Sequence, residues 1–174
     1  MRWLMRLSLL LCVVLGMGCG VQESPLESQA PLSAEAESLL KDLHGRWQLQ
    51  HLVIGFCPES IGKSPFMGQS RWEQKNGQLM MSPVQGNVAN LTLTPQSGET
   101  LTQNESITIE GCVVTQDITV TVQEMNGRYA QGVYAAHYYH DGSPSCSALA
   151  QSHGIQESCS VTADWSGVRL SRQP

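Results

Sequence analysis

Aliphatic and threonine side chains alternate with a period of two along much of this chain. The alternation is clearest at 91–93 (Leu-Thr-Leu), 107–109 (Ile-Thr-Ile) and 118–122 (Ile-Thr-Val-Thr-Val). Successive side chains of a strand point to opposite faces of a sheet, so the aliphatic residues face a core and the threonines face water. The pattern therefore predicts half-buried antiparallel strands and little helix.

Turn signals separate the predicted strands. Asn76-Gly77 stands between 71–75 and 78–82, and Asn126-Gly127 stands between 118–125 and 128–139. Asn-Gly favours the positive φ angles of a two-residue type I′ hairpin. We expect seven to nine short strands, forming an antiparallel β-barrel or a β-sandwich with one short N-terminal helix. That helix fits 33–43, with Ser33 as its N-cap.

Three regions of different composition divide the chain. Residues 1–18 begin with Arg2 and Arg6, continue with an apolar run at 7–15 and end in small residues, which is the layout of a secretory signal. Residues 19–38 are rich in Gln, Ser, Glu, Ala and Pro and contain no Lys or Arg, which is typical of a flexible acidic tether. The β pattern and its turns occupy 39–174.

The end of the signal, Leu-Gly-Met-Gly-Cys at 15–19, resembles the lipobox of bacterial lipoproteins. Leu15 stands one place further from the cysteine than is usual in that class. The resemblance implies cleavage before Cys19, lipid on Cys19, and attachment to the cell envelope. Gly20 after the cysteine implies the outer membrane, with the domain facing the periplasm or the cell surface. Ordinary secretion, with cleavage near Gly18, is the alternative.

Gly45-Arg46-Trp47 at the head of the first predicted strand resembles the Gly-x-Trp motif of lipocalins. In that family an arginine beyond the last strand packs on the tryptophan face. The resemblance therefore implies that Arg169 or Arg172 lies on Trp47 and closes a barrel. If Val168 and Leu170 face the core, Arg169 points outward and Arg172 becomes the expected partner.

The folded region contains four cysteines, Cys57, Cys112, Cys146 and Cys159. An even number in an exported domain predicts disulfides. Three pairings exist, and we favour Cys146–Cys159 because both flank one loop, which leaves Cys57–Cys112. Cys112 falls on the outer face of its strand unless Gly111 introduces a bulge.

No arrangement of residues in the sequence indicates catalysis, and we expect neither an enzyme nor a cofactor. Gly-x-Ser-x-Gly is absent and the carboxylates are scattered. His137 and His140 stand three apart on a predicted strand, so they point to opposite faces and we expect no metal site. The formal net charge of −5 argues against a nucleic-acid partner.

We expect a lipid-anchored envelope protein whose β domain is a structural or interaction module, with the membrane and an envelope protein as its partners. The alternative is a lipocalin-like carrier of a small apolar ligand, and an envelope enzyme ranks third. An open apolar mouth would favour the carrier, whereas a filled barrel would favour the module. In the carrier, the cavity would be lined by the aromatic residues Trp47, Trp72, Trp165, Tyr129, Tyr134, Tyr138 and Tyr139.

Overall fold

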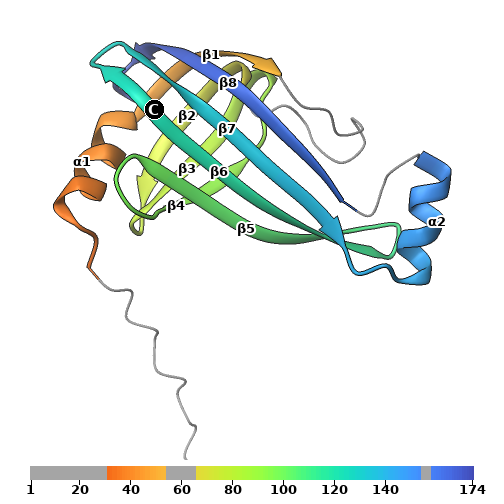
Figure 1. Ribbon diagram of the computed structural model, residues 1–174. Helices are drawn as coiled ribbons and strands as arrows, with labels where there is room; N and C mark the ends of the chain where they lie inside the picture. The colour runs from red at the N-terminus through yellow and green to blue at the C-terminus, as the bar shows by residue number, and fades with distance from the viewer. Residues whose placement is uncertain (1–30, 54–65, 154–157) are drawn as a thin grey trace, which may run out of the picture. The chain divides into compact units, whose positions relative to one another are not determined.

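The computed structural model describes residues 31–53, 66–153 and 158–174. Residues Leu32–Pro174 form one compact unit. Its eight strands make a closed antiparallel barrel in which each strand pairs with its neighbours in sequence and the last strand pairs with the first (Figure 1). This up-and-down, lipocalin-like barrel decides against the sandwich.

The elements follow one another in the order of the barrel. They are α1 (Ala34–Leu43), β1 (Gly45–Val53), β2 (Met67–Lys75), β3 (Gln78–Asn87), β4 (Leu91–Pro95), β5 (Thr100–Ile109), β6 (Cys112–Asn126), β7 (Tyr129–His140), α2 (Pro144–His153) and β8 (Ser158–Ser171). Neither described helix is long and apolar enough to cross a membrane.

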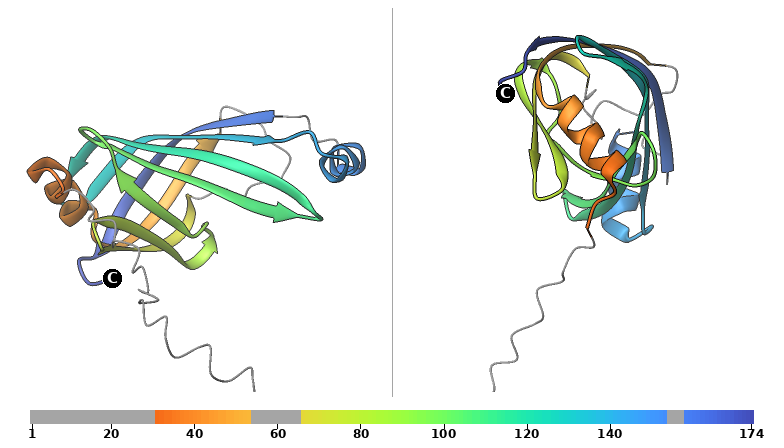
Figure 2. Two further views of the ribbon diagram at one scale, coloured as in Figure 1. Left: turned by 90° about the horizontal axis from the view of Figure 1, so that it is seen from below. Right: turned by 90° about the vertical axis from the view of Figure 1, so that its left-hand side faces the viewer.

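Helix α1 lies across one end of the barrel (Figure 2, right). Ser33 caps it by accepting a hydrogen bond from the Ala36 N–H at 3.2 Å, as the sequence predicts. Its buried face is formed by Leu39, Leu40 and Leu43. The compact unit begins at Leu32, so residues 32–38, which the sequence assigned to the tether, belong to the folded domain. The helix is part of that domain because this face needs the barrel to cover it.

Two of the three β-hairpins with two-residue turns follow the predicted Asn-Gly signals. Asn76 and Gly77, at φ 51° and 74°, join β2 to β3. The turn between β6 and β7 lies one residue later than predicted, at 127–128. Asn126 stays in β6 opposite Tyr129, and its side-chain oxygen accepts the Tyr129 N–H at 3.2 Å.

The third hairpin was not predicted. Glu110 and Gly111 have φ angles of 49° and 82° and join β5 to β6. Cys112 is therefore the first residue of a new strand and not an outer-face residue of the strand that contains Ile109. The reversal places Cys112 opposite Ile109 and buries its side chain fully.

Strand β4 is short, and this opens the barrel wall on one side. It pairs with β5 only through Thr94↔Thr102 and Pro95↔Leu101. The ladder between β5 and β6 continues to the Ile109↔Cys112 pair, well beyond the last β4 contact. Strands β5 to β8 therefore project past β4, and α2 lies at their far end (Figures 1 and 2).

Candidate functional site

The first and last strands meet at the end that α1 covers. Trp47 is fully buried on β1, and its indole N–H donates to the Leu43 carbonyl at 2.8 Å. The Arg169 guanidinium lies over the Trp47 ring, 4.7 Å from its centroid, and donates to the Asp42 carbonyl. Burial lowers the pKa of Arg169 from its ordinary value, with Arg172 as a second cause.

Of the two predicted arginines, Arg169 is the one that packs on Trp47. The condition that would have favoured Arg172 is not met, because Val168 and Leu170 are 52% and 51% exposed and occupy the outer face. Arg169, between them, therefore points into the barrel.

Aromatic side chains fill the barrel interior next to this closed end. Trp165 is the centre of the cluster: its ring stacks on Phe66 at 5.2 Å and meets Trp72 at 5.8 Å. Trp72 in turn contacts Trp47 at 5.4 Å, and Phe66 meets Tyr134 edge to face at 5.4 Å. This part of the interior is a packed core of the protein's own side chains.

The inner wall of the projecting strands carries polar groups. Glu105 and Gln116 are register partners on β5 and β6, and the Gln116 amide donates to the Glu105 carboxylate at 3.2 Å. Tyr138 continues this row on β7, with its hydroxyl 3.5 Å from that of Tyr134. Burial and the neighbouring Tyr138 raise the pKa of Tyr134 far above its usual value. Tyr134 is therefore a neutral phenol at physiological pH.

A groove of about 520 Å³ runs along the gap between β4 and β5. Its lining is almost entirely amide and hydroxyl groups, and Glu105 is its only ionisable side chain. Gln103 bridges the gap by accepting the Thr92 backbone N–H at 2.6 Å. The groove is lined by Gln78, Thr92, Thr94, Gln96, Thr102, Gln103, Asn104 and Glu105.

The outer face of the projecting strands aligns Asp117, His137 and Ser160 on three neighbouring strands. The Ser160 hydroxyl is 2.9 Å from Nδ1 of His137, and the Asp117 carboxylate accepts from the Asn104 amide. In a catalytic triad the serine bonds Nε2 and the carboxylate bonds Nδ1. Because this row is exposed and connected differently, we interpret it as a polar surface ladder.

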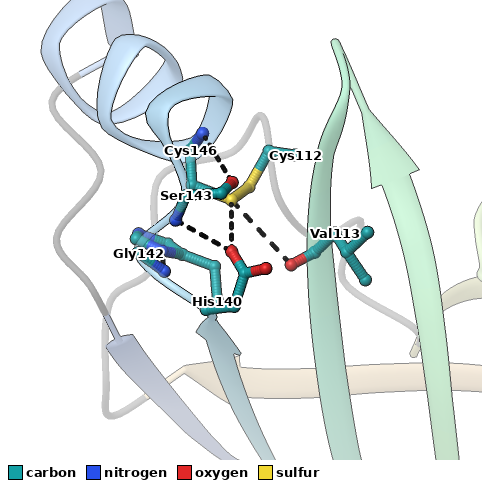
Figure 3. Close-up of a disulfide and its surroundings, with 7 residues drawn as sticks. Cys112, Val113, His140, Gly142, Ser143 and Cys146 are labelled. Carbon is teal, nitrogen blue, oxygen red and sulfur yellow. Dashed lines mark hydrogen bonds between the residues drawn. A yellow bond between two sulfur atoms is a disulfide. The ribbon is translucent and has the colours of Figure 1, made fainter.

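The disulfide pairing differs from the expected one. Cys112 is bonded to Cys146, with Cα atoms 4.6 Å apart (Figure 3). Cys57–Cys112 and Cys146–Cys159 are therefore both wrong. The unpredicted helix α2 is the physical reason, because it places Cys146 beside the start of β6. Cys159 is also disulfide-bonded, whereas Cys57 and the predicted lipid site Cys19 lie outside the described residues.

His137 and His140 point to different faces of β7, as predicted. The outward His137 stacks on the exposed Tyr139 ring at 5.5 Å. His140 lies instead beside the disulfide. Within the described ranges, the single group of three metal-ligand side chains is Cys112, His140 and Cys146.

No protein-family model, curated protein or solved structure matches this chain. The likeness to lipocalins therefore rests on the barrel order and on the contact between Trp47 and Arg169.

Proposed function

We propose that this protein is a lipid-anchored, non-catalytic interaction module of the cell envelope. The barrel is the module, Cys19 carries the lipid, and the preceding signal directs export. The filled interior carries the proposal, because Trp165 and Phe66 stack where a carrier would hold its ligand.

The groove between β4 and β5 is the contact surface that we propose for an envelope protein. Beyond Thr102, β5 pairs with β6 alone among the described strands, so its other edge offers backbone groups to an extended partner segment. The uncharged amides and hydroxyls around this edge suit a polar peptide.

A photo-crosslinking residue at Thr92 tests this contact in the intact envelope. We expect one discrete adduct that disappears when Thr94→Arg fills the groove with a long side chain. The matched control, Gln48→Arg, adds the same charge on the exposed face of β1 and leaves the adduct unchanged. An adduct that survives Thr94→Arg contradicts the groove as the contact surface.

The lipocalin-like carrier is the second candidate, supported by two buried donors. The indole N–H groups of Trp72 and Trp165 are buried and have no hydrogen-bond partner among the residues that the structure describes. Buried donors are usually paired, so an acceptor on a bound ligand would satisfy them.

Titration with an apolar fluorescent probe separates the two candidates. The carrier requires saturable binding at one probe per protein, with energy transfer from the buried tryptophans. The module predicts weak binding without saturation. Saturable binding that is lost in Trp72→Phe would decide for the carrier.

The anchor is tested separately by Cys19→Ser. We expect this variant to incorporate no labelled fatty acid and to leave the detergent phase. Unchanged labelling of Cys19→Ser would mean that Cys19 is not the lipid site.

A further inference from the structure

Three atoms with metal-ligand chemistry meet where β6 begins, β7 ends and α2 starts (Figure 3). The sulfur atoms of Cys112 and Cys146 and one ring nitrogen of His140 all lie within 4.8 Å of one another. The two cysteines are fully buried and share a disulfide. Each comes from a different element, so the fold and not a local motif assembles the group.

The His140 ring has a buried polar atom that the protein leaves unsatisfied. Nδ1 accepts the Gly142 N–H at 3.0 Å, so the neutral ring carries its proton on Nε2. Nε2 is buried and has no hydrogen-bond partner within the part of the chain that the structure describes. Buried polar atoms without a hydrogen-bond partner are rare, and a metal ion bound to Nε2 is one explanation for the atom found here. Coordination through Nε2 needs the neutral tautomer that carries its proton on Nδ1, so the proton moves from Nε2 to Nδ1. Nδ1 then no longer accepts the Gly142 N–H, which is exposed and turns to water.

A carboxylate oxygen of Asp141 lies beside one of the two sulfur atoms. This oxygen, Oδ1, lies 3.5 Å from Sγ of Cys146 and accepts the Ser143 N–H at 2.9 Å. Cys146 lies in the first turn of α2, where the Ser143 side chain accepts its backbone N–H at 3.4 Å and caps the helix.

We propose that the reduced form of this cluster is a zinc site, with Cys112, Cys146, His140 and Asp141 as its ligands. Two thiolates, an imidazole and a carboxylate form a donor set that tetrahedral zinc accepts. Zinc bonds of about 2.0–2.3 Å place ligand atoms about 3.3–3.8 Å apart, so shifts of about an ångström bring the two sulfur atoms and the His140 nitrogen to these separations. Asp141 lies outside this group of three, so its side chain has to turn toward the metal to complete the site. The disulfide is then the closed, metal-free form.

The conversion between the two forms balances as a two-electron step followed by a ligand exchange. A dithiol reductant supplies two electrons and two protons, the bond between the two sulfur atoms breaks, and the reductant leaves as its own disulfide. Zinc then displaces both thiol protons, which pass to the solvent as two bonds from zinc to sulfur form. Oxidation reverses the exchange and releases the metal.

Zinc titration of the purified full chain in detergent tests the proposal. After reduction with a phosphine, we expect binding of one zinc at this site and the release of two protons, whereas the oxidised chain binds none. Cobalt in place of zinc should give a thiolate-to-metal absorption band. His140→Asn should weaken zinc affinity by at least about 10–100-fold, the range seen even when only an outer contact is lost.

Matched variants separate this site from other thiols and histidines. His137→Asn changes the exposed histidine of the same strand, and Cys159→Ser removes a cysteine of another disulfide; both should retain the cobalt band, whereas Cys146→Ser should lose it. Tryptophan fluorescence reports whether the reduced chain stays folded. The proposal is overturned if the reduced chain binds no zinc, folded or unfolded, if Cys146→Ser keeps the band, or if the oxidised chain binds equally well.

Discussion

One arginine connects both ends of the folded chain at the residue scale. Arg169 of β8 covers the Trp47 ring of β1 and also binds the Asp42 carbonyl at the end of α1. A cation over an indole face contributes about 0.5–2 kcal/mol, and more where the site is dry. Arg169 is partly buried, so its contact with Trp47 is only partly screened by water.

A double-mutant cycle measures this contact. Combining Trp47→Phe with Arg169→Ala should give a coupling of about 0.5–2 kcal/mol in the free energy of unfolding by urea. Arg172→Ala is the control and should couple to Trp47→Phe by less than about 0.3 kcal/mol. If Arg169 and Arg172 couple equally to Trp47, the contact between Arg169 and the Trp47 ring does not itself stabilise the fold.

Tyr134 gives the barrel a dependence on alkaline pH. Its folded-state pKa lies far above the unfolded value of 10.0, so its contribution to stability is complete below pH 10 and is lost as pH rises further. Above pH 10 the folded chain keeps a proton that the unfolded chain has lost, so the free energy of unfolding falls by about 1.4 kcal/mol per pH unit. Tyr134→Phe should remove this slope in urea unfolding, whereas Tyr139→Phe, at an exposed position, should retain it.

Gly132 on β7 occupies a position without room for a side chain. A Cβ there would lie 1.8 Å from the Thr121 carbonyl oxygen of β6. We expect Gly132→Ala to lower the free energy of unfolding by at least about 1–3 kcal/mol, the usual range for overpacking. Gly98→Ala meets no atom within 4 Å and tests backbone strain alone, at φ 60°. Gly98→Ala should lower the free energy of unfolding by less than Gly132→Ala does. A larger loss for Gly98→Ala would exclude a steric clash as the cause of the Gly132→Ala effect.

At the scale of elements, the sequence predicted the features that depend on neighbouring residues alone, such as the inward and outward faces of a strand. Leu91 and Leu93 are buried and Thr92 is exposed, as their alternation predicts, because strand geometry alone decides the face. The Glu110-Gly111 turn escaped notice because glutamate is an unusual turn residue, and it needs the positive φ of 49° that the hairpin imposes. Helix α2 was missed because its sequence lacks a clear apolar stripe.

The candidate sites depended on contacts that sequence does not encode locally. The groove arises because β4 and β5 pair only through Thr94↔Thr102 and Pro95↔Leu101 and separate beyond these pairs, which no single motif specifies. The partner of Cys112 is Cys146 because an unpredicted turn and an unpredicted helix bring them together. Trp47 was identified from its motif, but its partner depended on which face of β8 is buried.

Peptide mapping of the exported, oxidised protein should recover Cys112 linked to Cys146. The bond closes a separation of 34 residues, for which chain entropy gives an upper figure of about 3–4 kcal/mol. The double variant Cys112→Ser with Cys146→Ser should lose up to that amount in urea unfolding. Recovery of Cys146 linked to Cys159 would contradict the observed pairing.

At the scale of the whole molecule, the barrel domain starts where the compact unit starts. A chain that begins at Leu32 should unfold at the same urea concentration as the full chain, because the unit includes all of α1. A chain that begins at Gly45 lacks the buried Leu40 and Leu43 and should lose at least about 4 kcal/mol, since each buried leucine contributes about 2–5 kcal/mol. Equal midpoints for all three chains would show that α1 is dispensable.

The pairing of β1 with β8 has a consequence for the order of folding. Every other pair in the barrel joins neighbours in sequence, whereas this pair brings Trp47 and Arg169 together across almost the entire domain. Contacts between distant residues form late because closing a long loop costs more entropy than closing a short one. During that interval β1 and β8 each present an open edge, the kind of surface that promotes aggregation. A chain that emerges N-terminus first, as in synthesis, makes β1 early and must wait for β8, so closure of the barrel sets how long the new domain is open to aggregation.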